Sequence, residues 1–348
     1  MAGLVAAVRL RELGVDVAVV EKGNRPGGSM VLSSCVTWRH REWDAFRSEC
    51  PAGDGALQRV VWERLDDSLR WLERTTAIEP VWQDTNNPRT TGRRYDPASL
   101  TDALVGRIGP DRLSLSAGGD IDVHRHHDDG DVDVHRHHDA LILATGGFPI
   151  RVARERGLPV RSNPWSEGDG LDYARSVGSA TAGDLEELYA RAMPAPPALV
   201  GERDYVRTSQ LYGGRARVTN ERGDEFFPGA PAWHENDLAQ AIARQPGGTA
   251  WFELDGADAN DPKVEAARDV GGEVIEANGA VRIHVAAGVT HTLGGLRTDD
   301  ACRVLREDGT PIDGLYAAGV DVGGVANGGY ASGLAQAIVQ GLVAAEAV

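Results

Sequence analysis

The apolar positions of the chain fall into blocks that predict helices and strands mixed along the sequence. Residues 2–13 repeat apolar side chains at helical spacing, and Gly14 ends this helix before an apolar run at 15–21 that predicts a buried strand. Helical spacing returns between Val60 and Leu72, and the segments "ALILATGG" and "GLYAAG" predict further strands. We therefore expect an α/β fold in which these strands form one mainly buried parallel sheet.

A Pro-rich break, "MPAPPALVG", begins at residue 193 and separates segments of different character. Residues 193–284 predict an inserted α+β cap domain that holds the substrate. After it the pattern returns to strand, Gly-rich loop and a long apolar helix from Gly333. The main domain is then discontinuous, formed by 1–192 and 285–348.

Composition limits the partners of this chain. The 348 residues carry a formal net charge of −16, which repels nucleic acid and anionic membranes at long range. No run approaches the ~18 to 20 apolar residues that would cross a bilayer, and Arg9 and Arg11 interrupt "MAGLVAAV" too early for a signal peptide. Cys35, Cys50 and Cys302 are few and widely spaced, as in reduced thiols. We expect a cytoplasmic enzyme for a small molecule, with no nucleic-acid partner and no integral membrane segment.

A duplicated His-rich segment, "DVHRHHD", occurs at 122–128 and at 133–139. Clustered imidazoles can bind zinc or nickel, but neither a thiol nor a fixed loop spacing completes a site here. A solvent-exposed hairpin around Asp129-Gly130 explains the repeat more simply. We therefore predict no metal site.

The start of the chain indicates a dinucleotide site. Such folds need G-x-G-x-x-G between the first strand and the first helix, and "MAGL" matches only the end of that motif, with Gly3 as its third glycine. We expect the first strand and two glycines to belong before Met1, and such a chain to be less stable and to bind its cofactor weakly. Glu21 ends the next strand, where these folds place the acid that binds the adenosine ribose.

Several motifs in order resemble the fumarate reductase and 3-ketosteroid dehydrogenase flavoprotein superfamily. They are "VVEKGNRPGGSM", "ALILATGGF", "NPWSEGDGLDYARSVGSA", "RVTNERGDEFF" and the C-terminal segment from "THTLGG" through "GGYASGLAQ", and together they span most of the chain. The resemblance implies a glutathione-reductase-type, Rossmann-like domain that binds FAD without a covalent bond. The residues it implies for FAD are Gly3, Glu21, Lys22, Gly27, Gly28, Ser29, Ser33, Ala144, Thr145, Gly146, Gly168, Asp169, Gly294, Gly319, Asp321, Ser332, Gly333 and Leu334.

The same resemblance implies catalytic roles for His291 and Thr292 on the substrate side, and a weaker one for Tyr330. The pattern also departs from the family. Asn236 stands where fumarate reductases have an arginine proton donor, and a second clamp arginine is replaced near Asn327. Because Asn cannot bind a carboxylate as Arg does, we expect a less anionic substrate than fumarate.

Smaller departures concern the cofactor and the cap. Val320 replaces the usual ribityl-contacting acid, with Asp321 displaced by one position, and the cap is short between 263 and 290. No His lies in "GGSMVLSSC", so we expect no covalent flavin link.

Two function classes remain open from the sequence. The first is an FAD-dependent enzyme that moves a hydride between a CH–CH substrate and flavin N5, with an unidentified electron donor or acceptor. The second is an inactive, N-terminally truncated relic that binds FAD weakly or not at all. A disulfide reductase, the third class considered, lacks its paired cysteines.

Overall fold

The computed structural model describes residues 1–116, 139–277 and 279–348. Apart from Asp139, both copies of the His-rich repeat fall outside those residues. The helices are α1 (Ala2–Glu12), α2 (Trp43–Glu49), α3 (Gly55–Thr76), α4 (Pro97–Ile108), α5 (Pro149–Arg156), α6 (Asp169–Ser176), α7 (Asn236–Ala243), α8 (Pro262–Asp269) and α9 (Gly333–Ala347).

The chain divides into two compact units. The first contains Met1–Phe148, Trp165–Glu186 and Thr292–Val348, and the second contains Pro149–Pro164 and Glu187–His291. The sequence analysis places the cap domain at 193–284, and these bounds differ from those of the two units. The domain bounds from the sequence stay a prediction.

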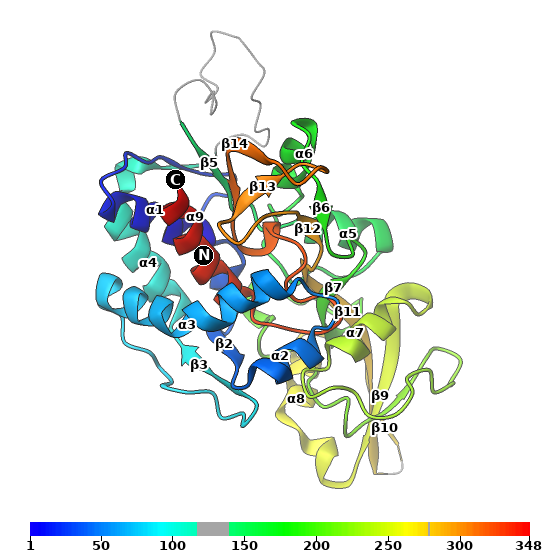
Figure 1. The fold of residues 1–348 in the computed structure, drawn as a ribbon. Coiled ribbons are helices and arrows are strands. Elements are labelled where there is room, and N and C mark those ends of the chain that lie inside the picture. The colour runs from blue at the N-terminus through cyan, green and yellow to red at the C-terminus, as the bar shows by residue number, and fades with distance from the viewer. Residues whose placement is uncertain (117–138, 278) are drawn as a thin grey trace. The chain divides into compact units, whose positions relative to one another are not determined.

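The core of the first unit is built on α9, whose side chains are buried along most of its length. It packs against α1 and α3, which Figure 1 shows beside it. A Cβ added at Gly341 would lie 2.7 Å from Ala2 O and 3.1 Å from Val5 Cγ1, so only glycine allows α9 and α1 to approach this closely. The start of α1 is thereby held against the C-terminal helix.

The strands of the first unit form short, separate sheets of two or three strands. They are β1 (Val19–Glu21) with β4 (Leu113–Leu115), β2 (Val36–His40) with β3 (Thr90–Arg94), β6 (Thr181–Ala182) with β12 (Gly295–Leu296), and β5 (Leu141–Leu143) and β13 (Arg303–Leu305) on either side of β14 (Pro311–Ala317).

The prediction that three strands share one sheet is therefore only partly right. β5 and β14 pair in parallel, whereas β1 bonds to β4 in a different sheet. Only residues 19–21 of the predicted strand 15–21 are a strand, because that is the length over which β4 supplies hydrogen-bond partners. The prediction that this strand is buried is wrong, since Val20 is 46% exposed. Within the described residues no strand bonds to both β1 and β5, so the ladder is not continuous.

The second unit is an antiparallel sheet with helices packed on it. Its strand order is β10 (Val274–Ala277), β11 (Ala280–Thr292), β9 (Thr249–Asp255) and β8 (Arg217–Thr219), and β7 (Leu188–Pro194) also pairs with β11. α7 packs on β7 and β9. In the described part of the chain, no helix combines the length and the apolar character needed to cross a bilayer.

Candidate functional site

The loop after β5, Ala144–Gly147, lies at the centre of the candidate site. Gly146 and Gly147 have φ values of 90° and 69°, in the left-handed region that favours glycine. Their amides converge on Asp321, which is 3% exposed. The loop predicted to contact the cofactor is thus fixed by a buried carboxylate.

The start of α1 and the turn after β14 meet the same loop. A Cβ on Gly3 would lie 3.3 Å from Ala144 Cβ, and one on Gly319 would lie 3.1 Å from Ala2 Cβ. Backbone atoms can approach a ligand where side chains are this small. The structure therefore brings together three residues that the sequence assigned to the cofactor, Gly3, Ala144 and Gly319.

The segment from Thr292 to Gly295 borders the same loop. A Cβ on Gly147 would lie 2.6 Å from Thr292 Oγ1, and one on Gly294 would lie 2.5 Å from Asp184 O. Gly294 therefore contacts backbone of this chain closely. The lack of a side chain at Gly294 is therefore needed for packing within the protein, whether or not Gly294 also contacts a ligand.

α9 begins at the site with a regular N-cap. Ser332 Oγ accepts a hydrogen bond from Ala335 N at 3.2 Å, and Gly333 and Leu334 form the first turn. The amides of that turn carry the positive end of a helix dipole. An electron-rich group near this turn would be stabilised.

The end of β1 holds the predicted ribose acid in a turn. Glu21 Oε1 accepts from Gly23 N at 2.8 Å, so the carboxylate is positioned by the loop that follows it. Lys22 Nζ donates to Glu167 at 2.8 Å and to Asp169 at 3.0 Å. Although burial lowers it, these hydrogen bonds leave the pKa of Lys22 above its usual value.

Lys22 and Asp169 thus bind each other, which the sequence could not indicate. Their ion pair ties the end of β1 to the start of α6, where Gly168 adopts a φ of 107°. Both side chains are oriented by this protein contact. The pair places the loop around Gly168 next to Glu21.

The paired glycines begin a short 3-10 helix, Gly28–Leu32, with Gly27 as its N-cap and Ser29 as its second residue. Gly27 has a φ of 102°, and a Cβ there would lie 2.6 Å from Val31 Cγ1. Ser33 Oγ donates to Met30 O at 2.8 Å and accepts from Cys35 N at 3.0 Å. The hydrogen bonds of the Ser33 hydroxyl therefore stabilise the turn at the end of this 3-10 helix.

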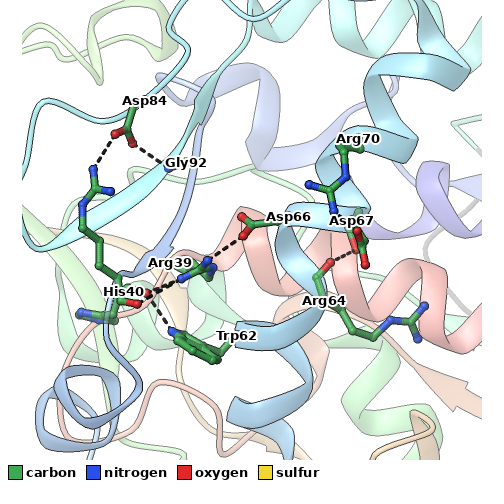
Figure 2. A network of polar contacts seen from close by, with 11 residues as sticks. Arg39, His40, Trp62, Arg64, Asp66, Asp67, Arg70, Asp84 and Gly92 are labelled. Atoms are coloured by element: carbon green, nitrogen blue, oxygen red, sulfur yellow. Dashed lines mark hydrogen bonds and ion pairs between the residues drawn. The ribbon is translucent and has the colours of Figure 1, made fainter.

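Tyr330 packs against β2 in the first unit. Its ring centroid lies 5.3 Å from that of Trp38. Figure 2 shows how β2 is tied to α3, because His40 O accepts from Trp62 Nε1 at 2.8 Å and Arg39 pairs with Asp66 at 2.6 Å. The phenol predicted as a weak acid-base candidate thus has a fixed aromatic neighbour.

His291, in the second unit, has neighbours that the sequence did not indicate. The rings of His291 and Tyr189 lie 5.1 Å apart, and Arg191 Cζ lies 4.9 Å from the Tyr189 ring. Arg191 also donates to His234 O. Tyr189 and Arg191 are two apart on β7 and so share a face, which is the alternation that could have found them.

Asn236 has a structural role in the same unit. It is 1% exposed, its Oδ1 accepts from Ala190 N at 3.0 Å, and its N–H donates to His234 Nδ1 at 3.0 Å. Asn236 therefore secures β7 and His234 to the start of α7. Arg191 supplies a cation beside Tyr189, the aromatic neighbour of His291, whereas Asn236 is uncharged.

The residues present fit FAD in their main features. Glycine loops, an acid at the end of β1 and two helix N-termini form the donor set that a dinucleotide needs. The side chains of Lys22, Ser33 and Asp321 are engaged within the protein. Glu21 Oε1 is likewise engaged, by Gly23 N, so backbone groups are the better supported contacts.

Comparison with known proteins agrees with this geometry. A family model described as an FAD binding domain matches residues 122–333, which is more than half of the chain. The chain belongs to this FAD-binding family. A model of an NAD(P)-binding Rossmann-like domain matches residues 1–37.

Curated relatives of this FAD-binding chain include fumarate and steroid enzymes. It is 24% identical over 426 aligned residues to the NADH:fumarate oxidoreductase of Klebsiella pneumoniae (strain 342), covering 97% of this chain and 45% of that protein. A KsdD-like steroid dehydrogenase of Mycobacterium tuberculosis is 52% identical over 50 residues, 14% of this chain and 8% of that protein. The chain thus spans less than half the length of the fumarate oxidoreductase.

Solved structures share the fold. The 3-ketosteroid delta1-dehydrogenase of Sterolibacterium denitrificans matches with a TM-score of 0.73 at 15% identity, covering 99% of this chain and 97% of that chain. A flavocytochrome c3 fumarate reductase matches with a TM-score of 0.70 at 20% identity, covering 99% and 76%. The predicted superfamily and its Rossmann-like fold with an inserted cap are confirmed.

Proposed function

We propose that this FAD-binding chain is an oxidoreductase that transfers a hydride between a CH–CH substrate and flavin N5. The observation that carries the proposal is the meeting of Ala144–Gly147, Thr292 and the turn Gly319–Asp321 in one unit. The names of the relatives, which are fumarate reductases and ketosteroid dehydrogenases, support the reaction class. An electron donor or acceptor outside this chain completes the cycle.

Backbone contacts hold most of the cofactor in this proposal. Glu21 accepts hydrogen bonds from the adenosine ribose, and the amides around Gly3 and Gly27–Ser29 face the pyrophosphate. The first turn of α9, capped by Ser332, places its amides toward the flavin. FAD supplies the chemistry of reversible hydride acceptance.

The state of the thiols supports non-covalent binding. Cys35, Cys50 and Cys302 are buried. Burial raises the pKa of Cys35 and of Cys302 to about 12. Because the thiolate is the nucleophile, these two cysteines remain unreactive at neutral pH.

The residues around His291 handle the substrate. The His291 imidazole orients a carbonyl or carboxylate group, and Arg191 beside Tyr189 adds one positive charge. A single guanidinium suits one carboxylate or an enolate-like oxygen rather than a dicarboxylate. An enoyl acid or a 3-ketosteroid therefore fits better than fumarate, and Thr292 and Tyr330 are the remaining candidates for contact with it.

Anaerobic mixing with candidate substrates tests this function. Holoprotein is mixed with saturated acids and with saturated 3-ketosteroids, and dithionite-reduced holoprotein with their unsaturated partners. We expect one class to reduce or reoxidise the flavin, and His291→Ala to slow this by about 10²-fold or more while flavin content stays unchanged. His284→Ala is the matched control, since His284 stacks on Trp251 at 4.6 Å in a separate cluster of the second unit. A flavin that responds to neither class contradicts the proposal.

A further inference from the structure

Asp321 is a buried carboxylate of the first unit that accepts four hydrogen bonds. Its Oδ2 accepts from Thr145 N and, at 3.2 Å, from Gly146 N. Its Oδ1 accepts at 2.9 Å from Gly147 N and at 2.9 Å from Thr145 Oγ1. Three successive amides that converge in this way form a nest, which is a common binding site for small anions. Here the anion is a side chain of the same protein.

The hydrogen-bond pattern around Asp321 suits an ionised carboxylate. Three of the four partners are amides that can only donate, and the fourth, the Thr145 hydroxyl, can also donate. A protonated carboxyl would need an acceptor for its own proton, and of these four partners only the Thr145 hydroxyl can accept. Burial raises the pKa of Asp321, and the hydrogen bonds from the loop oppose that rise.

The other side of Asp321 is fixed by α9. Gln336 Nε2 donates to Gly319 O at 2.8 Å and to Val322 O at 3.0 Å, and Gln340 Oε1 accepts from Gly319 N at 3.1 Å. The turn that carries Asp321 is therefore clamped by the helix whose first turn faces the candidate flavin position. Asp321 links this helix to the loop after β5.

We propose that Asp321 is a positioning residue whose carboxylate acts as a built-in anion, holding Thr145–Gly147 in the shape that receives the flavin and adding a fixed negative charge to the cofactor site. This inference rests on the proposed function and goes beyond it. Asp321 touches the loop and acts on the cofactor through that loop.

The carboxylate cannot be replaced by its amide. In Asp321→Asn, an NH2 group takes the place of one carboxylate oxygen and faces backbone N–H donors. The hydrogen bonds that this oxygen accepted from those N–H groups are lost. An external carboxylate such as formate, in contrast, could enter the nest if the side chain were shortened. This difference separates a need for negative charge from a need for volume.

The test compares Asp321→Asn and Asp321→Ala with the unchanged protein, each without and with formate, in full-length holoprotein. We expect both variants to bind FAD about 10- to 100-fold more weakly, since charge-assisted hydrogen bonds are lost. Flavin that remains bound should have a more positive midpoint potential, because a negative charge is gone. Formate should restore FAD affinity and melting temperature in Asp321→Ala and have little effect on the other two proteins.

A milder pair keeps the test decisive if those variants fail to fold. Thr145→Val removes one donor to Asp321, and Thr145→Ser keeps it. We expect Ser to behave as the unchanged protein and Val to weaken FAD binding several-fold. Equal FAD affinity and equal potential in Asp321→Asn and the unchanged protein, or no response of Asp321→Ala to formate, would overturn the inference. Should the unchanged protein bind no FAD, the proposed function fails, and the formate effect on melting temperature still decides the role of Asp321.

Discussion

Gly147→Ala probes the contact between the loop after β5 and Thr292. At a φ of 69°, an alanine costs about 1 to 2 kcal/mol in backbone strain. Its Cβ would also lie 2.6 Å from Thr292 Oγ1, and such overpacking costs about 1 to 3 kcal/mol. We expect a total loss of about 2 to 5 kcal/mol, shared between stability and FAD affinity because the loop serves both.

Gly309→Ala is the matched control, since Gly309 has a φ of 81° and a Cβ there would meet nothing within 4 Å. The assays are urea unfolding of apoprotein and FAD titration of each variant. Thr292→Ala in the Gly147→Ala background should recover the steric part, and the two changes should be non-additive. If Gly147→Ala and Gly309→Ala cost the same, and Thr292→Ala recovers nothing, then the contact between Gly147 and Thr292 has been misassigned.

Three further changes test separate parts of the site. Glu21→Ala should weaken FAD binding by about 1.5 to 3 kcal/mol, roughly 10- to 150-fold in a fluorescence titration, and an unchanged dissociation constant would make Glu21 a surface acid. Lys22→Met should weaken the same titration by less than about tenfold, because Lys22 Nζ binds Glu167 and Asp169 in a partly exposed ion pair; a larger loss would point to direct contact with FAD. Glu235→Gln should raise stability at neutral pH. Burial raises the pKa of Glu235, so the folded state binds its proton more tightly than the unfolded state does. Stability therefore falls as pH rises from the unfolded pKa to the folded pKa. The melting temperature plotted against pH should be flatter for the variant, and parallel plots for the two proteins would refute this.

The apolar periods and the ordered motifs were sufficient to predict the fold class, whereas the contacts of the glycine loops with FAD stay predictions. The helix predicted at 2–13 agrees with α1 to within one residue, and the helical spacing between Val60 and Leu72 lies inside the longer α3. The Ser332 N-cap was readable because capping is local. The extent of β1 was not readable, since a strand is only as long as its hydrogen-bonded partner allows. Local chemistry could be read from the sequence, but strand pairing at long range could not.

Side-chain partners far apart in sequence limited the prediction of the site. Lys22 is paired with Asp169, and Asp321 is bonded to the amides of Thr145–Gly147, although Lys22, Asp169 and Asp321 were assigned to FAD alone. The alternation on β7 places Tyr189 and Arg191 on one face, but nothing in the sequence shows that this face meets His291. These assignments to FAD and to catalysis stay predictions.

Titration of flavin-free protein with FAD tests the central claim most directly. The account predicts saturable binding of one FAD per chain, the visible spectrum of a bound flavin, and release of unmodified FAD on denaturation. It also predicts that Glu21→Ala and Gly147→Ala shift the titration to higher FAD concentrations while Gly309→Ala does not. Absence of saturable binding by folded protein, or flavin that stays attached after denaturation, would contradict the account.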